Sequence, residues 1–299
     1  MEPSRPDLTI SIISADNLTL LLPCLRSVFA STHRLTLEVF VVDNASTDGT
    51  AEAVAAEFPQ VKVIRNTRRL GFSTNNNLVL RQGQGRYLML LNDDTVVLDG
   101  ALDTLVAFMD DHPEAGAVGS YLLNPDRSLQ AAFASFPHPV IEAILPATSW
   151  TLAKARRQRG PFEVDSVCGA AMLVRREVLD QVGVLDTAFD PIYSEEVDWC
   201  YRIRQAGWKI YALPQSRVIH YGSVTMNQAV PRKYELLLSH KALFFRKHGG
   251  KTSAIIYRAI LGLTTACKVA WWTARSLFDK KHTDRRTLHL YLLSRIFRL

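Results

Sequence analysis

The sequence predicts an α/β fold, with a mostly parallel sheet flanked by helices and followed by a basic helical extension. Through the first third of the chain, short apolar runs alternate with segments of helical periodicity. Several of these runs end in polar residues, as strands do where they meet loops. The charge is divided unevenly: residues 1–229 hold 20 Lys and Arg against 26 Asp and Glu, whereas residues 230–299 hold 15 against 3.

Four apolar runs are expected to form parallel strands, because buried parallel strands are apolar along their whole length. These strands are expected over Leu8–Ser14, Leu37–Asp43, Val61–Asn66 and residues 86–93. The helices between them are expected from Asn17, as the N-cap residue, to Ala30, from the turn NASTDGT to Phe58, and over GFSTNNNLVLRQG. The ligand site is expected beyond the carboxyl ends of these strands.

The middle of the chain is less regular. Residues 146–167 are predicted to form a mobile, basic surface loop, and GAAMLVRREVL a strand and a short helix. EEVDWCYRIRQAG predicts an amphipathic helix that ends at Gly207, and WKIYALP and SRVIHYGS predict two short strands. The side of that helix expected to be buried carries Val197, Cys200, Tyr201 and Ile203.

Composition excludes several classes of protein. A chain of 299 residues that is 47% hydrophobic suits one large or two small globular domains. Its four cysteines lie far apart without a CxxC pair, which argues against a zinc ribbon or disulfide framework and favours a reducing compartment. The N-terminus lacks the plan of a signal peptide. Only the basic tail favours nucleic acid and no recognition motif occurs, so we expect no nucleic-acid partner.

The usual phosphate-binding loops do not occur in the sequence. No GxGxxG follows the first strand, and GxxxxGK[ST] is absent. A protein that binds a nucleotide diphosphate without them commonly uses a divalent metal held by carboxylates. In YLMLLNDDTVVL, Asp94 with Asp93 beside it fits that role, although for such a pair in isolation a solvated turn is the favoured explanation.

Other polar residues accompany this pair. Asp43 ends a strand, and SEEVDW places three acids at a helix N-terminus, where the helix dipole favours negative charge in any case. His220 ends an apolar strand, a position at which a lone histidine is more often structural than a ligand.

Taken in order, these stretches resemble the family-2 glycosyltransferases of the GT-A fold, in particular the rhamnosyltransferase-like branch that builds bacterial cell-surface polysaccharide. The resemblance spans about residues 8–223 and continues weakly to about Gly250. It implies a GT-A domain over residues 1–229, with a nucleotide-sugar half to about residue 120 and an acceptor half over 121–229. The basic region 230–299 would lie outside this domain.

The resemblance also implies site residues. The metal, Mg²⁺ or Mn²⁺, would be bound by Asp94 and His220; Asn92 replaces the first acid of the family's metal motif, and Asp16 stands where the family usually has tyrosine. The residues expected around the nucleotide sugar are Ser14, Asn17, Asp43, Asn44, Asp48, Gly71, Phe72, Asn76, Asn77, Asn92 and Asp93.

The family's Glu-Asp-x-Asp-x-Cys helix matches EEVDWC and implies the catalytic base. Glu196 takes the position of the base, where the family has aspartate, so Glu195 stays open as the alternative. Asp198 is expected to bind the acceptor or to brace the helix. The family implies a single displacement that inverts the anomeric centre.

The resemblance implies a dTDP, UDP or GDP sugar as donor, with rhamnose the first candidate, and a glycan or polyprenyl-diphosphate-linked acceptor. Residues 254–278 are apolar but interrupted by Arg258, Lys268 and Arg275, which favours a helix in the membrane interface over a spanning one. Trp271 and Trp272 would lie at headgroup depth. Packing on the body, or a homodimer, is the alternative. The enzyme is then expected in the cytoplasm, at the inner face of the cytoplasmic membrane.

Two other functions stay open. A sugar nucleotidyltransferase would normally open with a glycine-rich loop, and ISADNLTLLLP contains no glycine. A catalytically degenerate nucleotide-sugar or glycan-binding protein is compatible with the departures at Asn92 and Glu196. The presence of Asp43, Asp94 and His220 argues for an enzyme.

Overall fold

The computed structural model describes residues 5–144, 148–222, 230–276 and 283–296. The chain forms two compact units. One unit comprises residues 1–136 and 148–222, and the other comprises residues 137–147 and 223–299. The segment 137–147, near the middle of the chain, therefore groups with the C-terminal region. The domain boundary expected from the sequence, at residue 229, did not include this segment in the C-terminal part.

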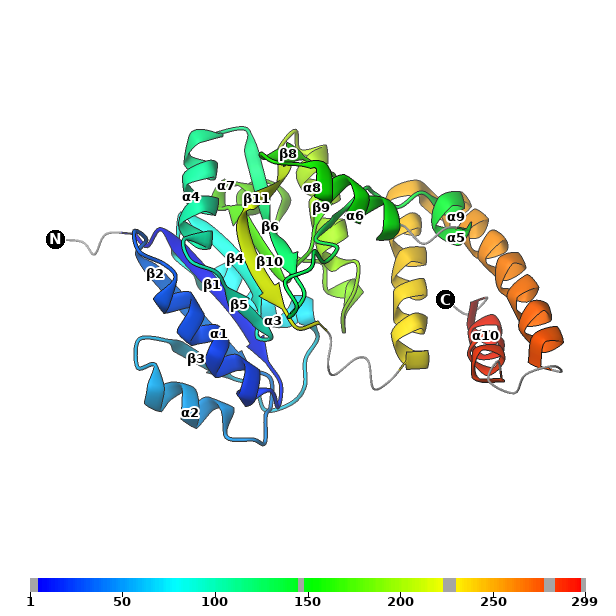
Figure 1. Ribbon diagram of the computed structural model, residues 1–299, viewed down its shortest axis with the longest axis horizontal. Helices are drawn as coiled ribbons and strands as arrows, with labels where there is room; N and C mark the ends of the chain where they lie inside the picture. The colour runs from blue at the N-terminus through cyan, green and yellow to red at the C-terminus, as the bar shows by residue number, and fades with distance from the viewer. Residues whose placement is uncertain (1–4, 145–147, 223–229, 277–282, 297–299) are drawn as a thin grey trace. The chain divides into compact units, whose positions relative to one another are not determined.

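The first unit is built on a nine-stranded sheet, in which β3, β2, β1 and β4 are neighbours and run parallel. These strands are β1 (Leu8–Ser14), β2 (Leu37–Asp43), β3 (Lys62–Arg65) and β4 (Tyr87–Asn92). The helices that connect them are α1 (Leu18–Ala30), α2 (Thr50–Glu57) and α3 (Phe72–Gln82) (Figure 1). The apolar runs that predict these strands form the core, with Ile10, Ile12 and Met89 fully buried.

The second half of the sheet has mixed strand directions. Its strands are β5 (Thr95–Val97), β6 (Ala115–Leu123), β8 (Phe162–Glu163), β10 (Ala171–Arg175) and β11 (Lys209–His220). β10 runs antiparallel to both β4 and β6, whereas β11 runs parallel to β6 and antiparallel to β5. The two strands predicted over residues 208–223 are one strand, whose register shifts between Leu213 and Arg217. The sheet is thus mostly parallel, as predicted. β11 ends with His220 at the same edge of the sheet at which β4 ends with Asn92.

The remaining elements of this unit cover the sheet or connect its strands. They are α4 (Ala101–Asp111), β7 (Phe133–Ala134), α6 (Thr148–Arg157), β9 (Ser166–Val167), α7 (Arg176–Val182), the 3-10 helix η1 (Thr187–Phe189) and α8 (Glu195–Gln205). The loop predicted over residues 146–167 is wrong in its described part, because α6, β8 and β9 lie within it. Residues 146 and 147 lie outside the described ranges.

The prediction of an amphipathic helix is confirmed by α8. Cys200 and Ile203 are buried as expected, whereas Val197 and Tyr201 are half-buried and Trp199 is fully buried. Gly207 follows the helix with a φ of +92°, a conformation that favours glycine and ends the helix.

The second unit is helical. It contains α5 (Pro139–Ile144), α9 (Val230–Ser276) and α10 (Thr283–Ile296), and both shorter helices pack on α9. Gly250 adopts non-helical angles (φ 74°, ψ 179°) and divides α9 into two helical pieces (Figure 1). By length and composition α9 is able to cross a membrane, and 28% of its most apolar window is buried.

Candidate active site

Sheet topology brings the predicted polar residues to one edge. Asp43 ends β2 and Asn92 ends β4, and both strands run parallel to β1, so their carboxyl ends meet. His220 is the Cα partner of Thr95 in the pairing of β11 with β5, which places it beside Asp94. Residues 126 positions apart in sequence therefore share one site.

The ring of His220 is oriented by hydrogen bonds with Gln130. Gln130 donates from Nε2 to Asn124 Oδ1 (3.0 Å) and to the carbonyl of His220 (3.2 Å). Its Oε1 therefore faces Nδ1 of His220, 2.6 Å away, and accepts a hydrogen bond from it. Nε2 of the same ring faces Oδ1 of Asp94 at 3.3 Å, and the amide nitrogen of Asn92 lies 3.3 Å from it on another side.

The pair fits a divalent cation. Asp94 is buried, and its Oδ1 has no hydrogen-bond partner among the described residues. Two acceptor atoms that face one another at 3.3 Å are satisfied by a shared cation or a proton. Ligands of one octahedral Mg²⁺ or Mn²⁺ ion lie about 3 Å apart. The described residues contain no group of three His, Cys, Asp or Glu that forms a complete metal site, so further ligands would be diphosphate oxygens and water.

Asp93 lies beside this pair in a different environment. Burial raises the pKa of its carboxyl to about 6, and the charge of Asp94 adds to this. The polar side chains of Ser14 and Asn17 lower that pKa again. The three residues, all predicted for the nucleotide-sugar side, are therefore neighbours. Asn92 completes the group, with its amide nitrogen 3.3 Å from Nε2 of His220.

The acidic helix α8 supplies two neighbouring carboxylates from its first turn. Glu195 is 3% exposed and Glu196 is half-buried, and Oε2 of each has no hydrogen-bond partner in the described part of the chain. Burial raises the pKa of both, and for Glu195 the charge of Glu196 raises it further. A carboxylate with a raised pKa is a stronger base, which suits removal of a proton from a hydroxyl.

The loop before β10 lies close to Glu196 and to the end of β4. A Cβ placed on Gly169 would lie 3.6 Å from Cβ of Glu196 and 3.7 Å from the ring of Phe72. Burial raises the pKa of the neighbouring Cys168 thiol to about 12, and the charge of Glu196 adds to this. Asp94 acts on the same thiol in the same direction. The same loop accepts the backbone N–H of Asn92 at the carbonyl of Ala170 (3.0 Å), so it lies beside both the base candidate and the strand that leads into Asp94.

Asp198 occupies a structural position. Its carboxylate is fully buried and accepts a hydrogen bond from Nε of Arg202 at 2.9 Å. Arg202 also donates to the carbonyls of Val182 and Val184. Of the two roles predicted for Asp198, this geometry supports bracing of the helix.

Asp190 was missed by the sequence reasoning. Its Oδ1 accepts the backbone N–H of Ser73 at 2.9 Å, and its Oδ2 accepts the hydroxyl of Thr74. The carboxylate thereby caps α3 and ties the segment before Glu195 to the donor side of the sheet. A Cβ on Gly71 would lie 2.1 Å from Cγ of Asp190, so this contact requires glycine. No local pattern marks a contact between residues 117 positions apart.

Several predicted nucleotide-side residues hold loops together. Asp48 accepts the N–H of Leu18 at 3.0 Å, so it caps α1 in place of the Asn17 side chain, which makes no capping hydrogen bond. Asp43 accepts the N–H of Ser46 at 2.9 Å. Asn44 accepts the N–H of Leu70 at 2.8 Å. These contacts join the loops that follow β1, β2 and β3.

The side-chain amides of Asn76 and Asn77 are buried and form hydrogen bonds with other groups of the protein. Asn76 accepts the hydroxyl of Ser11 at 2.7 Å and donates to the carbonyl of Phe72. Asn77 exchanges two hydrogen bonds with the backbone of Leu185. Their contact with a sugar nucleotide stays a prediction.

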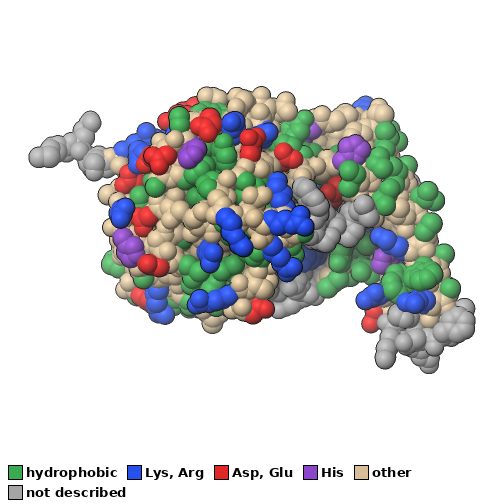
Figure 2. Space-filling view, turned by 45° about the horizontal axis from the view of Figure 1, so that its top comes forward, with side chains coloured by type: hydrophobic (Ala, Val, Ile, Leu, Met, Phe, Trp, Pro, Cys, Tyr) green, Lys and Arg blue, Asp and Glu red, His purple; other side chains and the backbone are tan. Residues whose placement is uncertain are grey.

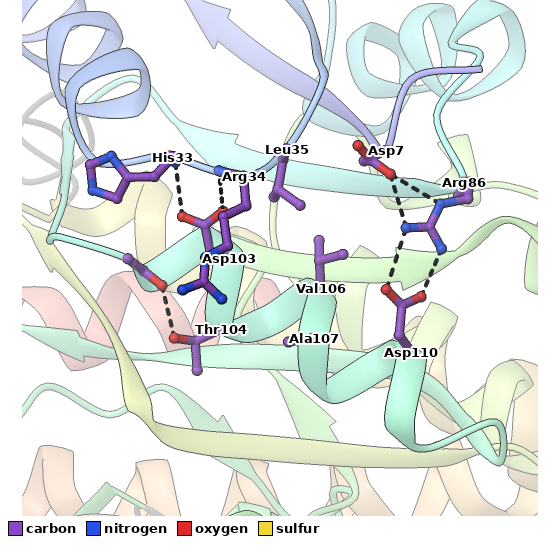
Figure 3. A pocket seen from close by; sticks show the side chains of 11 residues that line it. Asp7, His33, Arg34, Leu35, Arg86, Asp103, Thr104, Val106, Ala107 and Asp110 are labelled. Carbon is purple, nitrogen blue, oxygen red and sulfur yellow. Dashed lines mark hydrogen bonds and ion pairs between the residues drawn. The ribbon is translucent and has the colours of Figure 1, made fainter. Parts of the chain in front are cut away.

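A cavity of about 500 Å³ lies away from this site, before the amino ends of β1, β2 and β4 (Figure 3). Arg86 bridges Asp7 and Asp110 in its wall, and Asp103 accepts the backbone N–H groups of His33 and Arg34. These hydrogen bonds join the start of the sheet to α4. The arrangement is that of a structural contact.

Comparison with solved structures identifies the fold as the GT-A fold of glycosyltransferases. The chain aligns with mannosyltransferase PcManGT from Pyrobaculum calidifontis, solved with GDP-Man and Mn²⁺, at a TM-score of 0.58 and 20% identity over 97% of this chain and 85% of that one. It aligns with GalNAc-T7, solved with UDP, GalNAc and Mn²⁺, at a TM-score of 0.58 and 19% identity over 73% of this chain and 44% of that one.

The chain belongs to glycosyl transferase family 2, whose family model matches residues 9–183, and it is a glycosyltransferase. An N-acetylglucosaminyl-diphospho-decaprenol L-rhamnosyltransferase of Mycobacterium tuberculosis is 30% identical over 217 residues, which cover 66% of this chain and 70% of the relative. Rhamnosyltransferase WbbL of Escherichia coli is 24% identical over 162 residues, covering 50% of this chain and 61% of the relative. The rhamnosyltransferase-like resemblance is therefore confirmed.

Proposed function

We propose that the protein transfers a sugar, with rhamnose the first candidate, from a nucleotide-diphosphate donor to a glycan carried on a polyprenyl diphosphate. The observation that carries this proposal is that the loop before β10 lies beside both Glu196 and the end of β4, which leads into the Asp94–His220 pair. The 30% identical relative is named for an acceptor of this kind and for L-rhamnose. The resemblance to the branch that builds bacterial cell-surface polysaccharide leads us to infer a cytoplasmic enzyme at the inner face of the membrane.

The donor side is proposed to use a divalent metal, Mg²⁺ or Mn²⁺, held by Asp94 and His220. When bound there, the ion supplies Lewis-acid stabilisation of the charge on the leaving nucleotide diphosphate. Gln130 supports this role because it accepts a hydrogen bond from Nδ1 of His220 and so orients the ring with Nε2 toward Asp94. Both solved neighbours contain Mn²⁺, which agrees with a divalent metal.

The acceptor side is proposed to use Glu196 as general base. Its carboxylate takes the proton from the acceptor hydroxyl as that oxygen forms a bond to the anomeric carbon. The bond from this carbon to the diphosphate oxygen breaks in the same step, which inverts the anomeric centre. Glu196 is favoured over Glu195 because it is more exposed and lies beside Gly169 and Phe72.

The test is nucleotide release with a lipid-linked acceptor and Mn²⁺, compared between wild type and Glu196→Gln. Because a positioned base contributes about 10²–10⁴-fold, Glu196→Gln should lose at least a hundredfold in kcat while retaining donor binding. A near-normal kcat for Glu196→Gln together with a large loss for Glu195→Gln would transfer the role to Glu195. Normal rates for both variants would contradict the mechanism.

A further inference from the structure

The C-terminal unit contains a cavity of about 380 Å³ between α5, both pieces of α9 and α10. Its wall is mostly apolar and includes five leucines: Leu237, Leu238, Leu261, Leu288 and Leu292. A second hollow, of about 680 Å³, lies between α9 and α10 and shares four lining residues with the first: Tyr234, Lys268, Leu288 and His289. We call the two together the C-terminal trough. Ligand sites in proteins are typically concave, mostly apolar and of about 300–1,000 Å³.

One wall of the C-terminal trough is α5, which both pieces of α9 hold in place. Nζ of Lys241, before the break at Gly250, donates to Oε2 of Glu142. The hydroxyl of Thr264, after the break, donates to the carbonyl of Ala143 at 3.1 Å. The side chain of Glu142 is only 11% exposed, so its ion pair is largely withdrawn from solvent. The wall is therefore fixed by the protein's own contacts.

The charges that line the C-terminal trough are unbalanced. Among its described lining residues Glu142 is the one acidic side chain, and Lys241 neutralises it. Lys268 and Arg285 line the same trough and form no ion pair within the described part of the chain, while the guanidinium of Arg285 packs over the ring of Trp272 at 4.8 Å. Figure 2 shows Lys, Arg and His side chains among hydrophobic ones on the C-terminal helices. Cationic groups beside an apolar cavity match an amphiphile with an anionic head and an apolar chain.

The chain that forms α5 comes directly from the segment expected to form the acceptor half of the first unit. Phe136, three residues before α5 begins, packs on Tyr201 of α8 with ring centroids 5.0 Å apart. Its N–H donates to Asp165 at 3.0 Å. α8 also carries Glu196, the proposed base. The chain thus runs from a residue packed on the base helix into the wall of the trough, which favours an occupant that belongs to the acceptor.

We propose that the C-terminal trough binds the lipid part of the acceptor, an isoprenoid chain that ends in a diphosphate. The chain lies among the leucines of α9 and α10, and the diphosphate contacts the side chains of Lys268 and Arg285. A diphosphate carries more charge than the single phosphate of a phospholipid, which suits two cationic side chains. This inference rests on the proposed function, because it assigns a site to the polyprenyl diphosphate of that acceptor.

The test measures binding of farnesyl diphosphate to the full chain by isothermal titration calorimetry. Inorganic pyrophosphate, farnesol and dioctanoyl phosphatidylglycerol are the comparison ligands, and wild type should bind each of them about tenfold or more weakly. Lys268→Gln combined with Arg285→Gln should weaken binding of farnesyl diphosphate about tenfold or more, because each change removes a charge-assisted contact. The matched control, Arg246→Gln combined with Lys251→Gln, removes the same charge from exposed positions of α9 outside the trough and should bind as wild type does.

Three results would overturn the proposal. They are no binding of farnesyl diphosphate by wild type, equal affinity for any comparison ligand, and equal affinity of the trough variant and the control variant. Equal affinity for the phosphatidylglycerol would assign the trough to phospholipid. Sugar transfer separates this proposal from the proposed function: if wild type binds farnesyl diphosphate as expected but transfers no sugar, the proposed function fails and the site stands. If wild type transfers sugar and the trough variant has an unchanged KM for the lipid-linked acceptor, the site fails and the proposed function stands.

Discussion

The contact of Asp190 with the start of α3 makes a prediction whose size follows from the structure. Asp190→Ala removes an acceptor from the N–H of Ser73 at 2.9 Å and from the hydroxyl of Thr74. Hydrogen bonds to a charged group contribute about 1.5–3 kcal/mol each, and loss of an N-cap costs about 0.5–2 kcal/mol. Because Asp190 is half-buried, water can replace part of the lost hydrogen bonding in the variant. We therefore expect the free energy of unfolding to fall by about 2 kcal/mol.

For a unit of this size, such a loss lowers the melting temperature by about 4–8 °C. Asp190→Asn keeps one acceptor oxygen and should lose about half as much. Differential scanning calorimetry measures both, with Asp180→Ala as the control because Asp180 is exposed and forms no hydrogen bond with a described residue. The segment before Glu195 also loses its anchor, so kcat should fall in Asp190→Ala. If Asp190→Ala and Asp180→Ala have the same melting temperature, the capping contact does not stabilise the protein and the reasoning is refuted.

Three further predictions concern the same site. Burial raises the pKa of Glu196, and a general base must be unprotonated to act. The value of kcat/KM should therefore fall as the pH decreases, with a midpoint above the ordinary pKa range of glutamate. A midpoint within or below that range would contradict this. Gly71→Ala should destabilise the protein by about 1–3 kcal/mol in urea denaturation, because its Cβ meets Asp190, whereas Gly160→Ala, which has open space, should not; equal midpoints would contradict the close contact. Gln130→Leu should raise the Mn²⁺ concentration for half-maximal activity about 10–100-fold, and an unchanged metal titration would show that His220 needs no such orientation.

The parallel half of the sheet could be predicted from sequence because its signals are local. β1 and β2 begin and end at the predicted residues, since each is a continuous apolar run bounded by turn residues. α6 was missed because a basic, polar segment lacks the apolar periodicity by which helices are recognised. β11 was predicted as two strands because Pro214, Gln215 and Ser216 interrupt its apolar pattern, and its register shifts at that place.

The site could be predicted in its residue types but not in its supporting contacts. Asp94 and His220 were both expected as metal ligands, and the structure places them side by side. The residues that orient them act across the fold: Gln130 reaches His220 over 90 positions, and Asp190 reaches Ser73 over 117. Such contacts follow from strand order, which apolar patterning does not specify. For the same reason, the packing of α5 with the C-terminal helices could not be predicted.

The most direct test of the account is thermal unfolding with dTDP, UDP or GDP, with and without Mn²⁺, in wild type and Asp94→Ala. A ligand at a hundred times its Kd stabilises the folded state by about 2.7 kcal/mol, which corresponds to a shift of about 5 °C or more. The account predicts a shift for at least one nucleotide diphosphate that requires Mn²⁺ and is lost in Asp94→Ala. No shift with any nucleotide in wild type, or a shift that is equal in Asp94→Ala, would contradict the metal-dependent donor site.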